Sequence, residues 1–217
     1  MKKLPKEAEG VVLTNKQKAA HFWFYYKWYI IALAIISIIL AVSIHNCATK
    51  PNYDMTVVVA VSAELTDEAT TFLTEELSQY CDDYNGDGEV LLNVYNCCFS
   101  DNTAGIKDDS GSRYPNFISS FTEPENIVYI IDQDKIDYAD ISSDIDTSLN
   151  LPDLNGGGIK LNGTELEKAY TDASLLTFPE DTYMVRRALT GAFKDNEEAK
   201  KNFDNAHKFI TKFREAN

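Results

Sequence analysis

The residues best suited to chemistry in this sequence form the run Asp83-Tyr84-Asn85-Gly86-Asp87-Gly88-Glu89-Val90. Oxygen-bearing side chains at its first, third and fifth positions, with glycine at the sixth, match the first half of an EF-hand calcium loop. This spacing puts the oxygens of Asp83, Asn85 and Asp87 on the inside of one tight turn, and Glu89, at the seventh position, contributes a backbone carbonyl. The run therefore predicts a calcium site at Asp83, Asn85, Asp87 and Glu89.

The match to a calcium loop is incomplete. The twelfth position, which carries a bidentate Glu in an EF-hand, is Val94, and residues 89–99 have the pattern of a strand rather than of a helix. A calcium site would need a further carboxylate, from Asp82 or from a distant loop. The alternative is a helix-to-strand turn without metal, rich in Asn, Asp and Gly because these residues tolerate positive φ. The sequence suggests no cofactor other than calcium.

Two further pairs of charged residues are candidates for binding or catalysis. Asp132 and Asp134 follow an apolar run, and ligands commonly bind at the ends of α/β strands, where paired carboxylates can carry acid–base chemistry. Arg186 and Arg187 adjoin each other on a predicted strand, so at most one of them faces a given pocket. The alternatives are solvated loop carboxylates and a structural salt bridge, and the sequence favours both of them.

Enzyme signatures are largely missing. The sequence contains no GxSxG, HExxH, P-loop or CxxC motif. Of its three histidines, His21, His45 and His207, only the last belongs to the body of the C-terminal domain, where it is expected to face solvent on a helix. This disfavours a zinc site of several histidines and a Ser-His-Asp arrangement. We assign no catalytic residue, and the sequence favours a protein that is not an enzyme.

The four cysteines are Cys47, Cys81, Cys97 and Cys98, and their spacing is that of neither a metal site nor a disulfide scaffold. One bridge, from Cys81 to Cys97 or Cys98, is compatible with a location outside the cytoplasm. Small buried thiols are the favoured alternative.

A membrane segment sets the context for these residues. Trp28–Ile44 is seventeen residues without a charge, close to the length that crosses a bilayer. Aromatic residues crowd its entrance at 22–29, and most lysines of residues 1–50 precede it, so the positive-inside rule places the N-terminus in the cytoplasm. The predicted organisation is a basic, aromatic leader (1–27), a transmembrane helix (28–47), a tether (48–54) and an extracytoplasmic acidic domain (55–217).

Two alternatives to a retained single-pass anchor are weaker. A cleaved signal peptide has a shorter leader, and the small-x-small site Ala41-Val42-Ser43 lies inside the apolar run. A lipoprotein would carry a small residue just before its lipidated cysteine, whereas Asn46 precedes Cys47. The segment is therefore expected to stay in the cell membrane as a signal anchor.

Charge is divided unevenly along the chain. Residues 1–50 carry seven Lys and two acids, a net charge of +5, and residues 51–217 carry thirteen basic residues and thirty-two acids, a net charge of −19, which together give −14. The acidic domain repels nucleic-acid phosphate and anionic lipid, so we exclude nucleic acid as a partner. Calcium, magnesium and cationic partners are compatible with its field.

The elements that would position these residues alternate between strand and helix. Met55–Val61 is a β-branched run, Thr66 is the predicted N-cap of a helix, and Glu89–Phe99 is a second strand, which makes a βαβ pattern. Further expected elements are strands at Asn126–Asp132 and Thr182–Leu189, a short extended piece at Ile159–Leu161, and helices at Tyr114–Phe121 and Asn196–Glu215. We expect an α/β (or α+β) fold of about three layers, with a central, mostly parallel sheet of about four strands.

The stretch from FWFYYKWYIIALAIISIILAVSIHNC through MTVVVAV to DYNGDGEVLLNVY resembles a group of uncharacterised single-pass membrane proteins of clostridial-type Gram-positive bacteria. These proteins share an aromatic entry to one transmembrane helix, a Cys just outside it and a DxNGDGxV turn that leads into a strand. The resemblance implies an outer α/β region faintly similar to a lobe of an extracellular solute-binding protein. It implies no established activity and no catalytic residue.

The function expected from the sequence is a membrane-tethered extracytoplasmic domain that binds a protein partner or a small ligand without catalysis. This expectation rests on the anchor, the acidic α/β domain and the missing catalytic motifs. The alternatives are a cell-surface hydrolase that uses the carboxylates of Asp132 and Asp134, and an accessory subunit of a membrane assembly.

Overall fold

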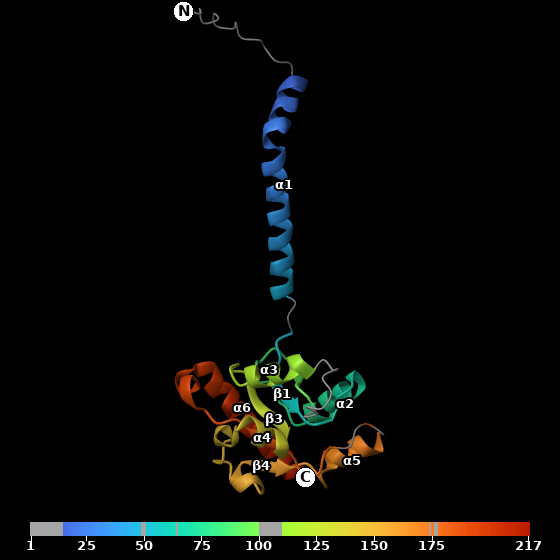
Figure 1. Cartoon of the computed structure of the whole chain (residues 1–217), viewed down its shortest axis with the longest axis vertical. Coiled ribbons are helices and arrows are strands. Elements are labelled where there is room, and N and C mark those ends of the chain that lie inside the picture. Colours follow the sequence, from blue (N-terminus) through green and yellow to red (C-terminus); the bar gives the residue numbers. More distant parts are fainter. Residues whose placement is uncertain (1–14, 49–50, 64, 100–109, 174, 176–177) are drawn as a thin grey trace, which may run out of the picture. The chain divides into compact units, whose positions relative to one another are not determined.

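The computed structural model describes residues 15–48, 51–63, 65–99, 110–173, 175 and 178–217. The chain divides into two compact units, Met1–Pro51 and Asn52–Asn217, called here the first and the second unit (Figure 1). The first unit contains one described helix, and all described strands belong to the second unit.

The helix of the first unit is α1 (Asn15–Ala48). Its stretch Tyr26–Ile44 is long and apolar enough to cross a membrane, and none of it is buried within the structure. Lys27 lies at the start of this stretch, with Nζ 5.8 Å from the ring centre of Phe24 and 5.7 Å from that of Trp28. The prediction of one apolar N-terminal helix suited to a membrane is confirmed. A helix of this length and composition serves either as a membrane anchor or as a signal sequence.

A five-stranded sheet in the order β2-β1-β3-β5-β4 forms the centre of the second unit. Strands β1 (Met55–Ala60), β2 (Leu92–Asn96) and β3 (Asn126–Asp132) are parallel. Strand β5 (Thr182–Arg186) runs antiparallel to β3, and the short β4 (Gly158–Lys160) runs antiparallel to β5. The α/β class is confirmed, whereas the prediction of about four mostly parallel strands is wrong, because the sheet has five strands and is mixed.

The error in strand direction has a physical cause. An apolar run such as 126–132 shows that a strand is buried on both faces, but it does not show which way its neighbour runs. Here the chain re-enters the sheet beside the end of β3, where Asp132 pairs with Thr182 and the Gln133 amide donates to the Asp181 carbonyl at 2.9 Å. Because β5 starts where β3 ends, the two strands run in opposite directions.

Helices cover both faces of the sheet, so the second unit has three layers (Figure 1). Alternate residues of β1 point to opposite faces, with Val57 and Val59 in one core and Val58 and Ala60 in the other. The first face is covered by α2 (Asp67–Ser78), α5 (Glu165–Asp172) and α6 (Glu197–Ala216), and the second by α3 (Ser110–Ser120) and α4 (Gln133–Ala139). Short 3-10 helices lie at Ser142–Asp144, Leu154–Gly156 and Gly191–Asp195.

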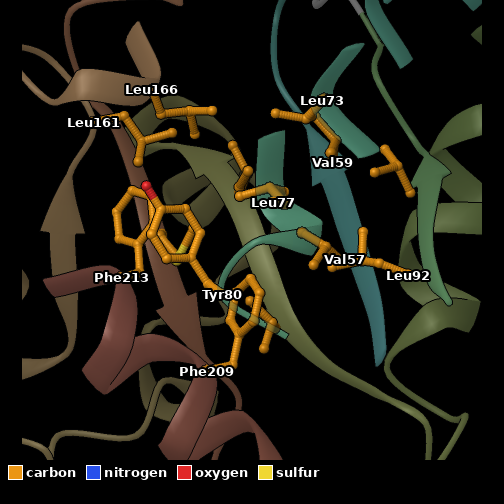
Figure 2. Close-up of a cluster of buried hydrophobic side chains, with 14 of the residues drawn as sticks. Val57, Val59, Leu73, Leu77, Tyr80, Leu92, Leu161, Leu166, Phe209 and Phe213 are labelled. Carbon is orange, nitrogen blue, oxygen red and sulfur yellow. The ribbon is translucent and has the colours of Figure 1, made fainter. Parts of the chain in front are cut away.

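Aliphatic and aromatic side chains fill the larger core. Leu73 and Leu77 of α2 lie over strand β1 (Figure 2). Next to them, Tyr80 meets Phe213 and Phe209 of α6 edge to face, with ring centres 5.2 and 6.4 Å apart. Burying each of these side chains contributes about 1.5–3 kcal/mol, and together they hold the C-terminal helix against the sheet.

Side-chain caps fix the starts of α2 and α6. Thr66 Oγ1 accepts a hydrogen bond of 3.2 Å from the Ala69 amide at the start of α2, so the predicted N-cap is confirmed. Asn196 Oδ1 accepts one of 3.0 Å from the Ala199 amide and begins α6, close to the predicted start of the terminal helix. Each cap satisfies one amide that has no partner within its own helix, which is typically worth about 1 kcal/mol.

Three cysteines lie in the interior. Cys81, Cys97 and Cys98 are buried, so the prediction of buried thiols is confirmed for them, and a bridge from Cys81 to Cys97 or Cys98 is not formed. Burial raises the pKa of both Cys81 and Cys97 to about 12. Because the thiolate is the reactive form, these buried thiols are poor nucleophiles.

Candidate functional site

The carboxyl ends of β1 and β3 meet at a topological switch point of the sheet. From β1 the chain crosses through α2 to β2 on one side, and from β2 it returns through α3 to β3 on the other side of β1. Helix α2, which follows β1, and helix α4, which follows β3, cover opposite faces of the sheet. Ligands of open α/β sheets commonly bind outside the carboxyl ends of the strands at such a point. The candidate site is therefore the side of the sheet formed by the carboxyl ends of β1 and β3, called here the carboxyl edge or simply this edge.

Asp132, at the end of β3, is the buried centre of this edge. Its Oδ2 accepts a hydrogen bond of 2.6 Å from the backbone amide of Ser62, which follows β1. Its Oδ1 accepts one of 2.6 Å from the hydroxyl of Thr182 at the start of β5. Burial raises the pKa of Asp132, while the two hydrogen bonds and the nearby Lys135 ammonium oppose the rise. The carboxylate thus joins the ends of three strands.

Lys135 and a group of aromatic rings lie on the same edge. Lys135 is fully buried in α4, and its Nζ lies 4.2 Å from the ring centre of Phe99. Phe99 contacts Tyr114 of α3 and Tyr138 of α4, with ring centres 5.5 and 6.4 Å apart, and the two tyrosines meet edge to face at 5.2 Å. Tyr138 is 58% exposed, so the aromatic group extends from a buried ammonium to the protein surface.

The two carboxylates singled out from the sequence lie in different environments. Asp132 is buried and accepts two hydrogen bonds, whereas Asp134 is exposed in the first turn of α4. Solvation, the favoured alternative, is therefore correct for Asp134 and wrong for Asp132, because a buried and a solvated Asp look alike in a sequence. His207 is exposed on α6, as predicted. Acid–base catalysis by the two aspartates would require both to face one substrate, and this geometry does not favour it.

Replacing Asp132 by asparagine is expected to preserve the fold and to change how stability depends on pH. Asparagine keeps an oxygen for the Ser62 amide, and its amino group can donate to the Thr182 hydroxyl, which in turn donates to the Pro179 carbonyl at 2.9 Å. Folding raises the pKa of Asp132 above 3.8, so the folded state binds this proton more tightly than the unfolded state does. The contribution of Asp132 to stability therefore falls as pH rises from the unfolded-state pKa through the higher folded-state pKa. Urea unfolding from about pH 4 to about pH 7 should show wild type losing stability relative to Asp132→Asn; a constant difference would contradict this.

The loop at 83–90 supports its own turn. The Asp83 carboxylate accepts hydrogen bonds from the amides of Gly86 and Gly88 at 2.6 and 2.9 Å. Asn85 and Asp87 each accept one from the amide two residues further on, at 2.8 and 3.0 Å. Gly86 and Gly88 have φ values of 80° and 92°, which only glycine adopts at little cost. The oxygen-bearing side chains therefore stabilise the loop without metal, as the turn alternative requires.

The organising residue of this loop is Asp54, which sequence reasoning assigned to the tether. It is buried, and its Oδ1 accepts hydrogen bonds from the amides of Tyr84 and Asn85 at 2.7 and 2.9 Å. Its Oδ2 accepts one from the Leu91 amide at 2.9 Å, and Asn85 Nδ2 donates to the Asn52 carbonyl at 2.8 Å. No local signal could have identified Asp54, because each of its partners lies at least 30 residues along the chain.

Calcium at this loop stays a prediction. Within the described residues, no group of three or more His, Cys, Asp or Glu is placed to hold a metal ion. Asp82, which was expected to be able to complete the site, forms an ion pair of 2.5 Å with Lys212 of α6. Asp83, Asp87 and Glu89 are exposed, so their carboxylates are open to a cation from solvent.

Millimolar calcium is expected to raise the Tm of the second unit by a few degrees, because a ligand that binds only the folded state stabilises it by mass action. Thermal unfolding with and without calcium measures the effect, and Asp87→Ala removes one ligand while leaving the Asp83 bonds in place. The absence of a shift in wild type, or an equal shift in Asp87→Ala, would remove calcium from consideration.

The two arginines of β5 and its end have separate structural roles. Arg186 is buried and pairs with the carboxylate of Asp146, through Nε at 2.9 Å and through Nη2, so the predicted salt bridge is confirmed for it. Arg187 donates from Nη1 to the Phe121 carbonyl at 2.6 Å and lies 4.2 Å from the ring centre of Phe193. Burial lowers the pKa of Arg187, and within the described residues its Nε and Nη2 have no hydrogen-bond partner.

Compared with known proteins, the chain matches no family model, no curated protein sequence and no solved structure. The resemblance to clostridial-type membrane proteins therefore stays a prediction. The candidate site is defined by its geometry, namely a switch point closed by Asp132 and bordered by aromatic rings that reach the surface.

Proposed function

We propose that this protein is a membrane-tethered binding protein, in which α1 is retained in the cell membrane with its N-terminus in the cytoplasm and the acidic second unit binds a partner outside. The observation that carries the proposal is the apolar stretch Tyr26–Ile44, none of which is buried against other described residues. Burying such a surface in hydrocarbon is favourable, and a helix satisfies its own backbone groups there. The lysines that precede it, against Lys50 alone on its near downstream side, support the orientation.

Binding is favoured over catalysis by the way the polar groups at the candidate site are used. The Asp132 carboxylate holds the ends of β1, β3 and β5 together, so it is committed to the fold. The surface of the same edge presents Tyr138 instead, and exposed aromatic side chains are typical of recognition surfaces. A rigid three-layer domain with such an edge is suited to holding a partner near the membrane.

The experiment that tests the tether uses the full chain with a C-terminal tag in a bacterial host. The protein should stay in the membrane fraction after an alkaline wash, keep its full mass, and lose the tag when intact cells are treated with protease. A chain that lacks residues 1–47 should be soluble and protected in intact cells. Release of a shortened product would show a cleaved signal, and a protected tag in the full chain would show the opposite orientation; either result would overturn the proposal.

Assays of the second unit separate binding from hydrolysis. A surface hydrolase should turn over ester, phosphoester or peptide substrates and lose that turnover in Asp132→Asn, which retains the fold. Turnover that depends on Asp132 would replace the proposal with the hydrolase alternative. An accessory subunit would instead lose its copurifying membrane partners when α1 is exchanged for an unrelated transmembrane helix.

A further inference from the structure

Helices α3 and α4 present a small group of outward-facing apolar side chains, Tyr114, Ile118 and Tyr138, called here the tyrosine patch. Tyr138 is 58% exposed, more than any other large apolar side chain described in the second unit. Tyr114 is half-buried and touches it, with the ring centres 5.2 Å apart. Ile118 is exposed one helical turn beyond Tyr114, on the same side of α3. The three side chains therefore form one continuous surface across two helices.

Exposed acidic side chains accompany this patch along α4. Asp134 is exposed one turn before Tyr138, Asp137 is exposed next to it, and Asp140 is exposed at the end of the helix. The Asp137 carboxylate accepts a hydrogen bond of 2.9 Å from Gln133 Nε2, which holds it in place at the surface. These carboxylates stand in the field of a region that carries a net charge of −19. A positively charged partner is attracted to such a surface and an anionic partner is repelled.

The aromatic rings of the patch already share a cluster with an ammonium group. Lys135 Nζ lies 4.2 Å from the ring centre of Phe99, and Phe99 contacts both Tyr114 and Tyr138. Aromatic rings attract cations through the negative charge above their faces. Tyr138 offers this attraction on the outer side of the cluster, where it is open to solvent.

We propose that the tyrosine patch binds a lysine-rich segment of a protein partner, with an ammonium group against Tyr138 and others on the carboxylates of α4. The inference rests on the proposed function, because it names the partner chemistry of the binding domain. From Asp134 to Asp140 the helix rises about 9 Å, too far for one small amine to span. Alternate lysines of an extended peptide are about 7 Å apart and can meet two of these carboxylates at once.

The test uses the full chain in nanodiscs of uncharged phosphatidylcholine and a fluorescent decapeptide of alternating lysine and serine. Fluorescence anisotropy should show saturable binding that weakens as salt is raised, since screening reduces the attraction between exposed charges. A matched decapeptide with asparagine in place of lysine should not bind. Equal binding of the two peptides, or no binding of the lysine peptide, would overturn the inference.

Variants of the patch locate the binding. Tyr138→Ala should weaken peptide binding about three- to fivefold, whereas Tyr138→Phe, which keeps the ring, should bind like wild type. The double variant Asp134→Asn/Asp137→Asn should weaken it about fivefold or more at low salt. All three side chains are exposed, so these changes leave the core untouched, and an unchanged Tm verifies this.

Matched controls remove the same chemistry elsewhere on the second unit. Tyr53→Ala takes away a tyrosine that is 44% exposed, and Asp67→Asn/Glu68→Gln removes two exposed charges from the first turn of α2. Both controls should bind within about twofold of wild type. Equal losses of peptide affinity in the controls and in the patch variants would show that the peptide is attracted to the acidic domain as a whole, and would overturn the assignment of binding to the tyrosine patch. Peptide binding and membrane orientation are measured separately, so failure of either is distinguishable from failure of the other.

Discussion

Replacing Asp146 by alanine is expected to destabilise the second unit by about 3–5 kcal/mol, because it leaves a buried guanidinium without its counter-ion. Arg186 is 2% exposed, and both its Nε and its Nη2 donate to Asp146. The other contacts of Arg186 are with the Ser148 hydroxyl at 3.0 Å, the Phe203 carbonyl at 3.5 Å and the Phe203 ring at 3.8 Å, and none of these neutral groups can neutralise its charge. Urea unfolding of residues 52–217, followed by circular dichroism, measures the loss.

The double variant Arg186→Met/Asp146→Ala is the control for this first effect. Methionine keeps an apolar side chain at this position and removes the guanidinium charge that lies over the Phe203 ring, so the double variant should be more stable than Asp146→Ala alone. A double variant less stable than the single one would show that the guanidinium contributes mainly through its neutral contacts.

Asp54→Ala is expected to cost about 2–4 kcal/mol and to loosen the loop that follows α2. The substitution leaves three backbone amides, those of Tyr84, Asn85 and Leu91, without the acceptor that the carboxylate supplies. Unpaired donors in partly buried positions each cost about 1–3 kcal/mol unless water reaches them. Unfolding experiments measure the loss, and hydrogen exchange should become faster at these three amides first.

Two variants calibrate the Asp54 effect. Asp54→Asn keeps one oxygen, which can still accept from the Tyr84 and Asn85 amides, and should fall between wild type and Asp54→Ala. Asp83→Ala removes two bonds to Gly86 and Gly88 in an exposed part of the same loop and should cost about 1 kcal/mol or less, because water replaces the carboxylate. Equal losses in Asp54→Ala and Asp83→Ala would contradict a special role for the buried carboxylate.

The elements that sequence predicted well are those whose cause is local. The β-branched run at 55–61 is typical of a strand that is covered on both faces, as β1 is. Thr66 and Asn196 each begin a helix by accepting a hydrogen bond from the amide three residues further on. The same holds for the apolar N-terminal helix, which is recognisable from its length and lack of charge. Strand direction is not local, and this is why the antiparallel β5 could not be foreseen from its own residues.

The polar residues that organise the fold escaped prediction for a related reason. Asp132 is bonded to Ser62 seventy residues earlier, Asp146 to Arg186 forty residues later, and Asp54 to amides 30 to 37 residues later. Each looks like a solvated loop residue until the fold brings its partner close. Lys135 shows the same difficulty, because a lysine in a short polar helix gives no sign that it is fully buried. The calcium motif was recognisable because all its proposed ligands lie within one loop.

The junction at Asp54 has a mechanical consequence for a tethered domain. A pull on the chain from the N-terminal side enters the second unit at Asn52 and continues directly into β1, the strand that has β2 and β3 as parallel neighbours on its two sides. Force along that strand loads the hydrogen bonds of both neighbours in shear, so many bonds share it instead of opening one after another. The carboxylate of Asp54 adds three bonds at the point where the load arrives. A domain joined to its tether in this way is suited to hold its shape under tension, because the bonds of Asp54 to the loop at 83–91 and the ladders of β1 share the load.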